Sequence, residues 1–103
     1  MSHSKVGTTA VPSAGTRVQL STGTRRVKRI YFKASEANTG DMYFGDSAVS
    51  ATVGISLDQA RSGTDWHDID FTPSSENENF FWVDAATGGD SLDFYMVYVD
   101  GGR

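Results

Sequence analysis

The sequence VKRIYFKASEANTGDMYFGDSAVSATVGISL, residues 27–57, decides the fold. In residues 30–34 apolar and polar side chains alternate, which is the period-two pattern of a half-buried strand. Residues 38–40 are Asn-Thr-Gly, and Asn and Gly tolerate the positive φ of a tight turn. The alternation returns in residues 41–44 and again in residues 54–57. This stretch therefore predicts strand, turn, strand, loop and strand.

The same pattern extends to the rest of the chain. Val27 and Ile30 are out of phase, so a β-bulge near Lys28-Arg29 is expected to bring both into the core. Seven short strands are predicted, at residues 16–20, 25–34, 41–44, 54–57, 66–71, 79–85 and 91–100. Such spacing predicts an all-β fold, an antiparallel β-sandwich of jelly-roll or immunoglobulin-like type, in one domain over residues 16–103. Residues 1–15 are small, polar and unpatterned, and they predict a flexible N-terminal arm.

The last predicted strand, residues 91–100, is apolar on both faces in its second half. One face carries Leu92, Phe94, Met96 and Tyr98, and the other carries Tyr95, Val97 and Val99. A strand of this kind is either central in its sheet or covered on its second face by a partner.

Composition excludes several classes of function. The 103-residue chain contains no cysteine, which rules out thiol catalysis, cysteine-based zinc sites and disulfides. No apolar run is long enough to span a membrane, and no secretory signal peptide is expected at the N-terminus. The sequence lacks a G-x-S-x-G elbow, so His67 is expected to be a rim residue rather than a general base. Asp65, Asp68 and Asp70 do not form a calcium-loop signature. We therefore expect a non-enzymatic protein without a cofactor.

Charge is divided unevenly along the chain. Residues 1–33 contain seven basic and no acidic residues, whereas residues 34–103 contain thirteen acidic and two basic ones. In one interpretation, basic strands lie beside acidic strands of the same sheet. In the other, the basic segment docks on an acidic partner surface, and its contact residues are Lys5, Arg25, Arg26, Lys28 and Arg29. Nucleic acid is disfavoured because the acidic majority repels phosphate.

Four aromatic residues suggest a binding surface of a second kind. Trp66, Trp82, Tyr43 and Tyr95 would form a platform for stacking sugars if they were exposed on one face. They would equally serve as core residues or as anchors in a protein interface, where Tyr and Trp are enriched.

The order of these features resembles that of small β-sandwich virion structural proteins of tailed bacteriophages. In that family a strand precedes an N-x-G turn, a second strand ends in Gly-Asp, and an aromatic-aliphatic strand follows a DAATxGD-like turn. The matching positions in this chain are Asn38, Gly40, Gly45, Asp46, Asp84, Ala85, Gly89 and Asp90. The likeness covers about residues 16–99, although Asp58-Gln59-Ala60 replaces the family's proline-glycine turn.

This resemblance, to virion proteins of the capsid decoration (cement) or head-fibre type, implies a decoration or cement protein that stabilises the head shell. The expected partner is the major capsid protein or another virion protein, and a homotrimer is the expected assembly. The basic residues would contact the shell, and Tyr95, Val97 and Val99 would pack between subunits. The location implied is the capsid exterior of the virion, after synthesis in the host cytoplasm, with no membrane or nucleic-acid partner. The alternative is a tail or fibre module that binds host-surface carbohydrate.

Overall fold

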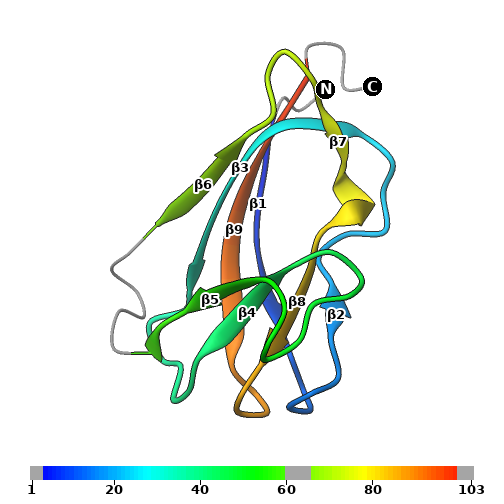
Figure 1. Ribbon diagram of the computed structural model, residues 1–103. Helices are drawn as coiled ribbons and strands as arrows, with labels where there is room; N and C mark the ends of the chain where they lie inside the picture. The colour runs from blue at the N-terminus through cyan, green and yellow to red at the C-terminus, as the bar shows by residue number, and fades with distance from the viewer. Residues whose placement is uncertain (1–3, 60–65, 100–103) are drawn as a thin grey trace.

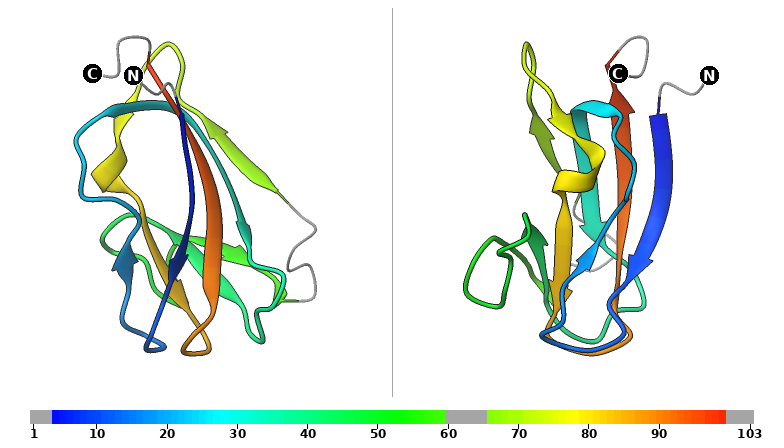
Figure 2. Two further views of the ribbon diagram at one scale, coloured as in Figure 1. Left: turned by 180° about the vertical axis from the view of Figure 1, so that it is seen from behind. Right: turned by 90° about the vertical axis from the view of Figure 1, so that its right-hand side faces the viewer.

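A computed structural model describes residues 4–59 and 66–99 of the chain. Two antiparallel sheets pack face to face, and the right-hand view of Figure 2 shows them edge-on as separate layers. The predicted all-β sandwich is therefore confirmed. No helix among the described residues is long and apolar enough to cross a membrane.

The first sheet contains the longer strands. Its strands run in the order β1 (Ser4–Ala10), β9 (Ser91–Tyr98), β3 (Arg26–Ala34) and β6 (His67–Asp70). A fifth strand, β7 (Glu76–Asn77), also pairs with β3, at its first two residues. β3 and β9 occupy the centre of this sheet, whereas β1 and β6 end its path (Figure 1). β9 is central in its sheet, but its outward residue Tyr95 is 37% exposed, so strand order alone does not account for the apolar character of its second face.

The second sheet is smaller. It runs in the order β2 (Val18–Gln19), β8 (Trp82–Ala85), β4 (Met42–Gly45) and β5 (Ile55–Leu57). A single 3-10 turn, Glu78–Phe80, connects β7 to β8. The central pairing of β4 with β8 joins the segment that decides the fold to a segment about forty residues further along the chain.

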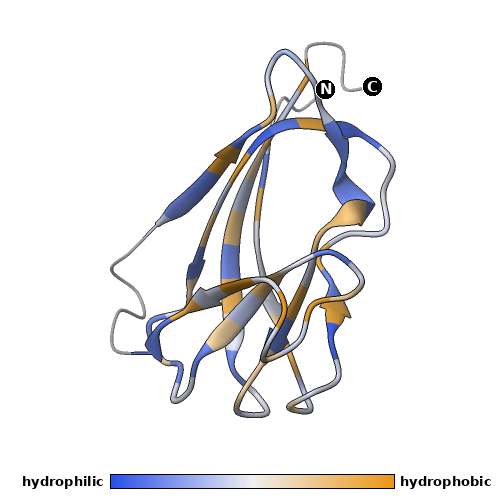
Figure 3. Ribbon diagram, viewed as in Figure 1, coloured by the Kyte–Doolittle hydropathy of each residue, from blue (hydrophilic) through white to orange (hydrophobic). Residues whose placement is uncertain are grey.

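Aromatic residues form the centre of the core. The rings of Phe32 and Phe44, one from each sheet, stack with their centroids 3.9 Å apart, and Phe81 lies 5.8 Å from Phe44. Figure 3 shows the alternation of hydrophobic and hydrophilic residues along β3 that directs such side chains inward. All four residues predicted for the inner face of β9 are buried: Leu92, Phe94, Met96 and Tyr98.

The predicted bulge is confirmed. The register between β3 and β9 shifts between Val27 and Arg29, which leaves Lys28 as the extra residue. Val27 and Ile30 are both completely buried as a result. The bulge therefore resolves the phase conflict that is visible in the sequence.

The predicted flexible arm is wrong for residues 4–10, which form the edge strand β1. Seven consecutive residues of β1 pair with β9, from Ser4 opposite Val97 to Ala10 opposite Ser91. The sequence conceals this strand because its inward positions hold Lys, Gly and Thr rather than large apolar residues. Gly7 is required there, since a Cβ at this position would lie 2.8 Å from the ring of Phe94. Residues 1–3 of the predicted arm lie outside the described part of the chain.

The predicted number of seven strands is also too low. β1 comes from the supposed arm, and β7 lies between the strands predicted at residues 66–71 and 79–85, where no strand was expected. β7 forms because residues 76–77 pair with Val27 and Arg26 at the start of β3. Two residues carry no periodicity, so such a strand has no signature in the sequence.

Candidate functional site

The solvent-facing side of the first sheet, here called the outer face, is built from residues that directly oppose one another. Direct cross-strand partners share a face, so the register defines rows of side chains. The three rows are Thr8, Asp93 and Lys33; Val6, Tyr95, Tyr31 and Asp68; and Ser4, Val97, Arg29 and Asp70. Apolar and aromatic side chains therefore occupy the middle of the face, next to the edge strand β1.

Basic and acidic side chains on the outer face pair with each other. Arg29 Nη2 lies 2.6 Å from Asp68 Oδ2, and Arg29 Nη1 lies 3.8 Å from Asp70 Oδ2. Lys33 Nζ lies 2.8 Å from Asp93 Oδ2. The hydrogen bond to Asp68 raises the pKa of Arg29 further above its usual value. The uneven charge distribution thus corresponds to basic β3 lying between strands that carry aspartates, as in the first of the two interpretations.

The structure brings together only some of the predicted partner-binding residues. Arg29, Tyr95 and Val97 share the outer face. Val99 follows β9, half-buried, and its N–H donates to the carbonyl of Arg26 at 2.9 Å. Lys28 occupies the bulge and is half-buried.

The other predicted basic residues lie elsewhere. Lys5 is exposed but is opposite Met96, which places it on the inward phase of β1. The Arg26 guanidinium donates to Ser75 Oγ at 2.9 Å and to Asn77 Oδ1 at 3.0 Å. The Arg25 guanidinium lies 3.8 Å from the centre of the Tyr98 ring. These contacts anchor both arginines at the start of β3, away from the rows described above.

Three residues of the outer face were missed or only partly recognised from the sequence. Tyr31 stacks obliquely on Tyr95, with the ring centroids 5.8 Å apart. Val6 is 74% exposed, and it was hidden in the supposed arm. Trp66 is 51% exposed and lies with its ring centre 5.2 Å from Lys33 Nζ. An aromatic residue at the polar phase of an alternating strand, such as Tyr31, is the signal that would have indicated this face.

The predicted aromatic platform is divided between the two sheets. Trp66 and Tyr95 belong to the outer face, whereas Tyr43 and Trp82 belong to β4 and β8 of the second sheet. Both residues of the second sheet are half-buried. A flat surface that contains all four aromatic residues does not exist.

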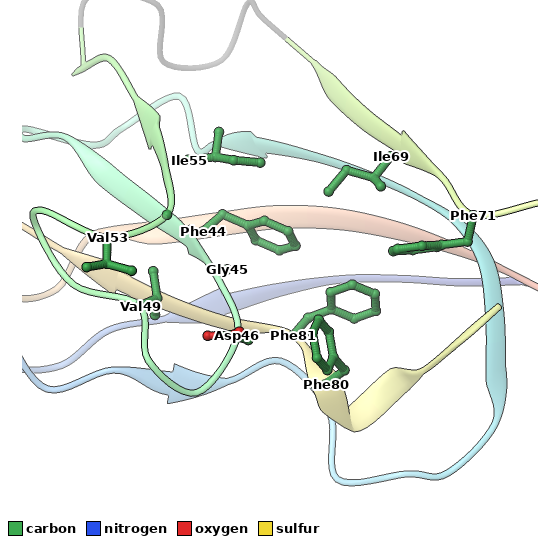
Figure 4. A pocket seen from close by; sticks show the side chains of 11 residues that line it. Phe44, Gly45, Asp46, Val49, Val53, Ile55, Ile69, Phe71, Phe80 and Phe81 are labelled. Atoms are coloured by element: carbon green, nitrogen blue, oxygen red, sulfur yellow. The ribbon is translucent and has the colours of Figure 1, made fainter. Parts of the chain in front are cut away.

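A second apolar feature is an open pocket of about 280 Å³ between the two sheets, on the side where β5 and β6 lie (Figure 4). Four phenylalanines and four aliphatic residues line it: Phe44, Phe71, Phe80, Phe81, Val49, Val53, Ile55 and Ile69. Val53, Ile55 and Phe80 are exposed at its margin. Among the described lining residues the one charged group is Asp46, whose carboxylate accepts a hydrogen bond from the N–H of Ala48. The lining of this pocket therefore offers mainly contact with apolar groups.

One deeply buried acidic group, Glu78, belongs to the structural framework. Glu78 is 4% exposed and accepts hydrogen bonds from Ser21 Oγ at 2.7 Å, Arg25 N at 2.9 Å and Tyr98 Oη at 3.2 Å. Burial acts to raise the pKa of Glu78, but these hydrogen bonds outweigh it and lower the pKa below its usual value. Burial and the nearby Glu78 charge raise the pKa of Tyr98. Glu78 is therefore a charged acceptor that ties β2, β3 and β9 together.

The residues that carry the phage-protein resemblance also have structural roles. The Asp90 carboxylate accepts from the N–H groups of Thr39 and Gly40, at 3.1 and 2.8 Å. The Asn38 amide donates to the carbonyl of Ser91 and accepts from its N–H, both at 2.8 Å. These bonds fasten the loop after β3 to the start of β9. The motif thus specifies a loop conformation rather than a reactive site.

Neither a metal-binding group nor a related protein indicates a function for the described part of the chain. Within residues 4–59 and 66–99, no group of three or more His, Asp or Glu side chains is arranged to hold a metal ion. Comparison with protein-family models, with curated proteins and with solved structures found no match. The outer face and the apolar pocket are therefore the features from which a function can be argued.

Proposed function

We propose that this protein is a non-enzymatic structural component of a tailed-phage virion, a decoration or cement protein that binds the major capsid protein on the outside of the head. The resemblance of residues 16–99 to small phage β-sandwich proteins supports the class. The outer face supports the mode of action, because it offers a surface for docking and no reactive group.

The observation that carries the proposal is the middle of the outer face. Val6, Tyr95, Tyr31 and Val97 form an aromatic and aliphatic patch on directly opposed strands. Ion pairs border this patch, so its charged residues are already paired before any partner arrives. Interfaces typically combine such an apolar centre with a polar rim, and Tyr is enriched in them.

The edge of β1 adds a second contact. β1 ends the strand order of its sheet, so along the described chain one of its sides pairs with β9 and the other has no neighbouring strand. A partner strand can extend the sheet there through backbone hydrogen bonds. In our proposal a capsid segment or a second copy uses this edge while the patch packs on the shell. Three copies around a common axis, the trimer expected from the resemblance, would each present the same surface.

The test is binding of the purified protein to phage heads that lack it, measured by co-sedimentation. Val6→Asp places a charge in the patch, and because Val6 is 74% exposed this change should leave the fold intact. We expect at least a tenfold loss of binding, since about 1.4 kcal/mol of lost interface energy already has this effect. The matched control is Val53→Asp, which changes a valine that is 52% exposed at the apolar pocket.

Binding that survives Val6→Asp but is lost with Val53→Asp would transfer the docking role to the apolar pocket. Equal binding by both variants and the wild type would refute a role for the outer-face patch. Failure of the wild type to bind any heads would refute the decoration role.

A further inference from the structure

One end of the outer face is more polar than the aromatic and aliphatic patch at its centre. A shallow pocket of about 310 Å³ opens there between β1 and Trp66. Its lining residues are Val6, Gly7, Thr8, Trp66, Asp93 and Phe94. An exposed indole ring thus faces a group of polar side chains across a hollow at the small end of the size range of ligand sites.

The polar groups of this pocket are held in place before any ligand arrives. The Asp93 carboxylate accepts from Thr8 Oγ1 at 2.9 Å, from Ser35 Oγ at 2.7 Å and from Lys33 Nζ at 2.8 Å. Burial acts to raise the pKa of Asp93, but the hydrogen bonds from Lys33, Ser35 and Thr8 lower it below its usual value. The group therefore presents a fixed carboxylate, a fixed ammonium and hydroxyls that can still accept hydrogen bonds.

The Lys33 ammonium links the polar group to the indole. Its Nζ atom lies 5.2 Å from the ring centre of Trp66 and bonds Asp93 at the same time. The Lys33 side chain is only 14% exposed, so it is an ordered part of the surface. This contact fixes the relative positions of the aromatic surface and the hydrogen-bonding groups.

We propose that this pocket, lined by Trp66, Asp93 and Thr8 and bordered by Lys33, is a binding site for a neutral saccharide. A sugar ring has an apolar C–H face that suits an indole and a rim of hydroxyls that both donate and accept hydrogen bonds. The charges of Lys33 and Asp93 cancel, so the pocket gives no net attraction to a sulfated, phosphorylated or sialylated ligand. The pocket shares Val6 with the docking patch, whose other members Tyr31, Tyr95 and Val97 do not line it.

The ligand requirement follows from the size of the pocket. Its volume suits one pyranose unit. A single sugar on one aromatic residue buries little surface, so weak, millimolar affinity is expected for a monosaccharide. Several copies on one particle would raise the avidity for a cell surface.

The experiment is ligand-observed saturation-transfer NMR on the full chain, with the methyl glycosides of glucose, galactose, mannose and N-acetylglucosamine. Sialyllactose serves as the charged probe. We expect at least one neutral glycoside to bind and Trp66→Ala to weaken its binding at least tenfold. Thr8→Val, which removes one hydroxyl from the polar group, should weaken binding while leaving the indole in place.

Phe80→Ala is the matched control, because it removes an exposed aromatic ring at the distant apolar pocket. Retained binding in this variant supports the site, and thermal melts of all variants establish that they are folded. The proposal is overturned if no neutral glycoside binds, if only sialyllactose binds, or if folded Trp66→Ala binds as the wild type does. Each of these results leaves the docking proposal untouched, since the head-binding assay does not involve Trp66.

Discussion

Replacement of Glu78 by alanine is expected to be the most damaging single change to a polar residue in this fold. The Glu78 carboxylate is the common acceptor for Ser21 Oγ, Arg25 N and Tyr98 Oη. Its removal leaves a hydroxyl, a backbone N–H and a phenol without this acceptor in a site where Glu78 itself is 4% exposed. Buried donors that lose their acceptor are costly because water does not replace the lost bond.

The magnitude follows from the number of bonds. A hydrogen bond contributes about 1 kcal/mol net, and one to a charged group contributes about 1.5–3 kcal/mol. The Tyr98 bond is long at 3.2 Å, so we assign it the lower value. Three lost bonds then destabilise the fold by about 4–7 kcal/mol, which is a large share of the roughly 5–15 kcal/mol available to a small domain. Tyr98→Phe, which removes only the long bond, should cost about 1 kcal/mol.

The assay is urea denaturation followed by tryptophan fluorescence, with free energies of unfolding obtained by linear extrapolation. Glu36→Ala is the matched control, because Glu36 is exposed, and a change of less than about 0.5 kcal/mol is expected there. A loss below about 1 kcal/mol for Glu78→Ala would refute the reasoning, since it would mean that the three donors find other partners at no cost.

Three further predictions concern acid, the edge strand and the surface ion pairs. The pKa values of Glu78 and Asp93 are lowered in the folded state, so the unfolded state binds more protons in acid. Stability should therefore be fully present above about pH 5 and fall as the pH drops below 4, with a smaller fall in Glu78→Ala. Deletion of residues 1–10 should cost about 3 kcal/mol, measured by urea denaturation against a chain that lacks only residues 1–3, because loss of β1 uncovers Phe94 and Leu92. An unchanged midpoint would restore the arm interpretation. Arg29→Ala should lower the urea midpoint only slightly, because its ion pairs lie between side chains that are more than 40% exposed, and the difference should shrink in about 1 M salt.

The sequence indicated the interior of this protein well. Alternation in β3, β4 and β9 identified the buried positions, and the phase conflict between Val27 and Ile30 located the bulge. These features are readable because burial of one face imposes a period of two on the side chains. The deep polar contacts were not readable, since Glu78 meets its partners from segments more than fifty residues away in two of three bonds.

The edges and the outer face were predicted less well, for a physical reason. An edge strand such as β1 is held by backbone hydrogen bonds and needs few apolar residues, so its sequence resembles that of a loop. Arg29, Tyr95 and Val97 were correctly expected to be on strands, but only the register places them side by side. Tyr31 joins them from β3, Val6 from the supposed arm and Trp66 from the position just before β6. Such a surface depends on strand order, which the sequence pattern does not encode.

The central claim is that this protein decorates a phage head, and the most direct measurement is its copy number in purified particles. Quantitative mass spectrometry of phage from the producing culture gives the ratio of this chain to the major capsid protein. The account predicts a ratio near one copy per shell subunit, as expected for a protein that covers the head. A few copies per particle would place it in the neck or tail instead, and its absence from the particles would contradict the claim outright.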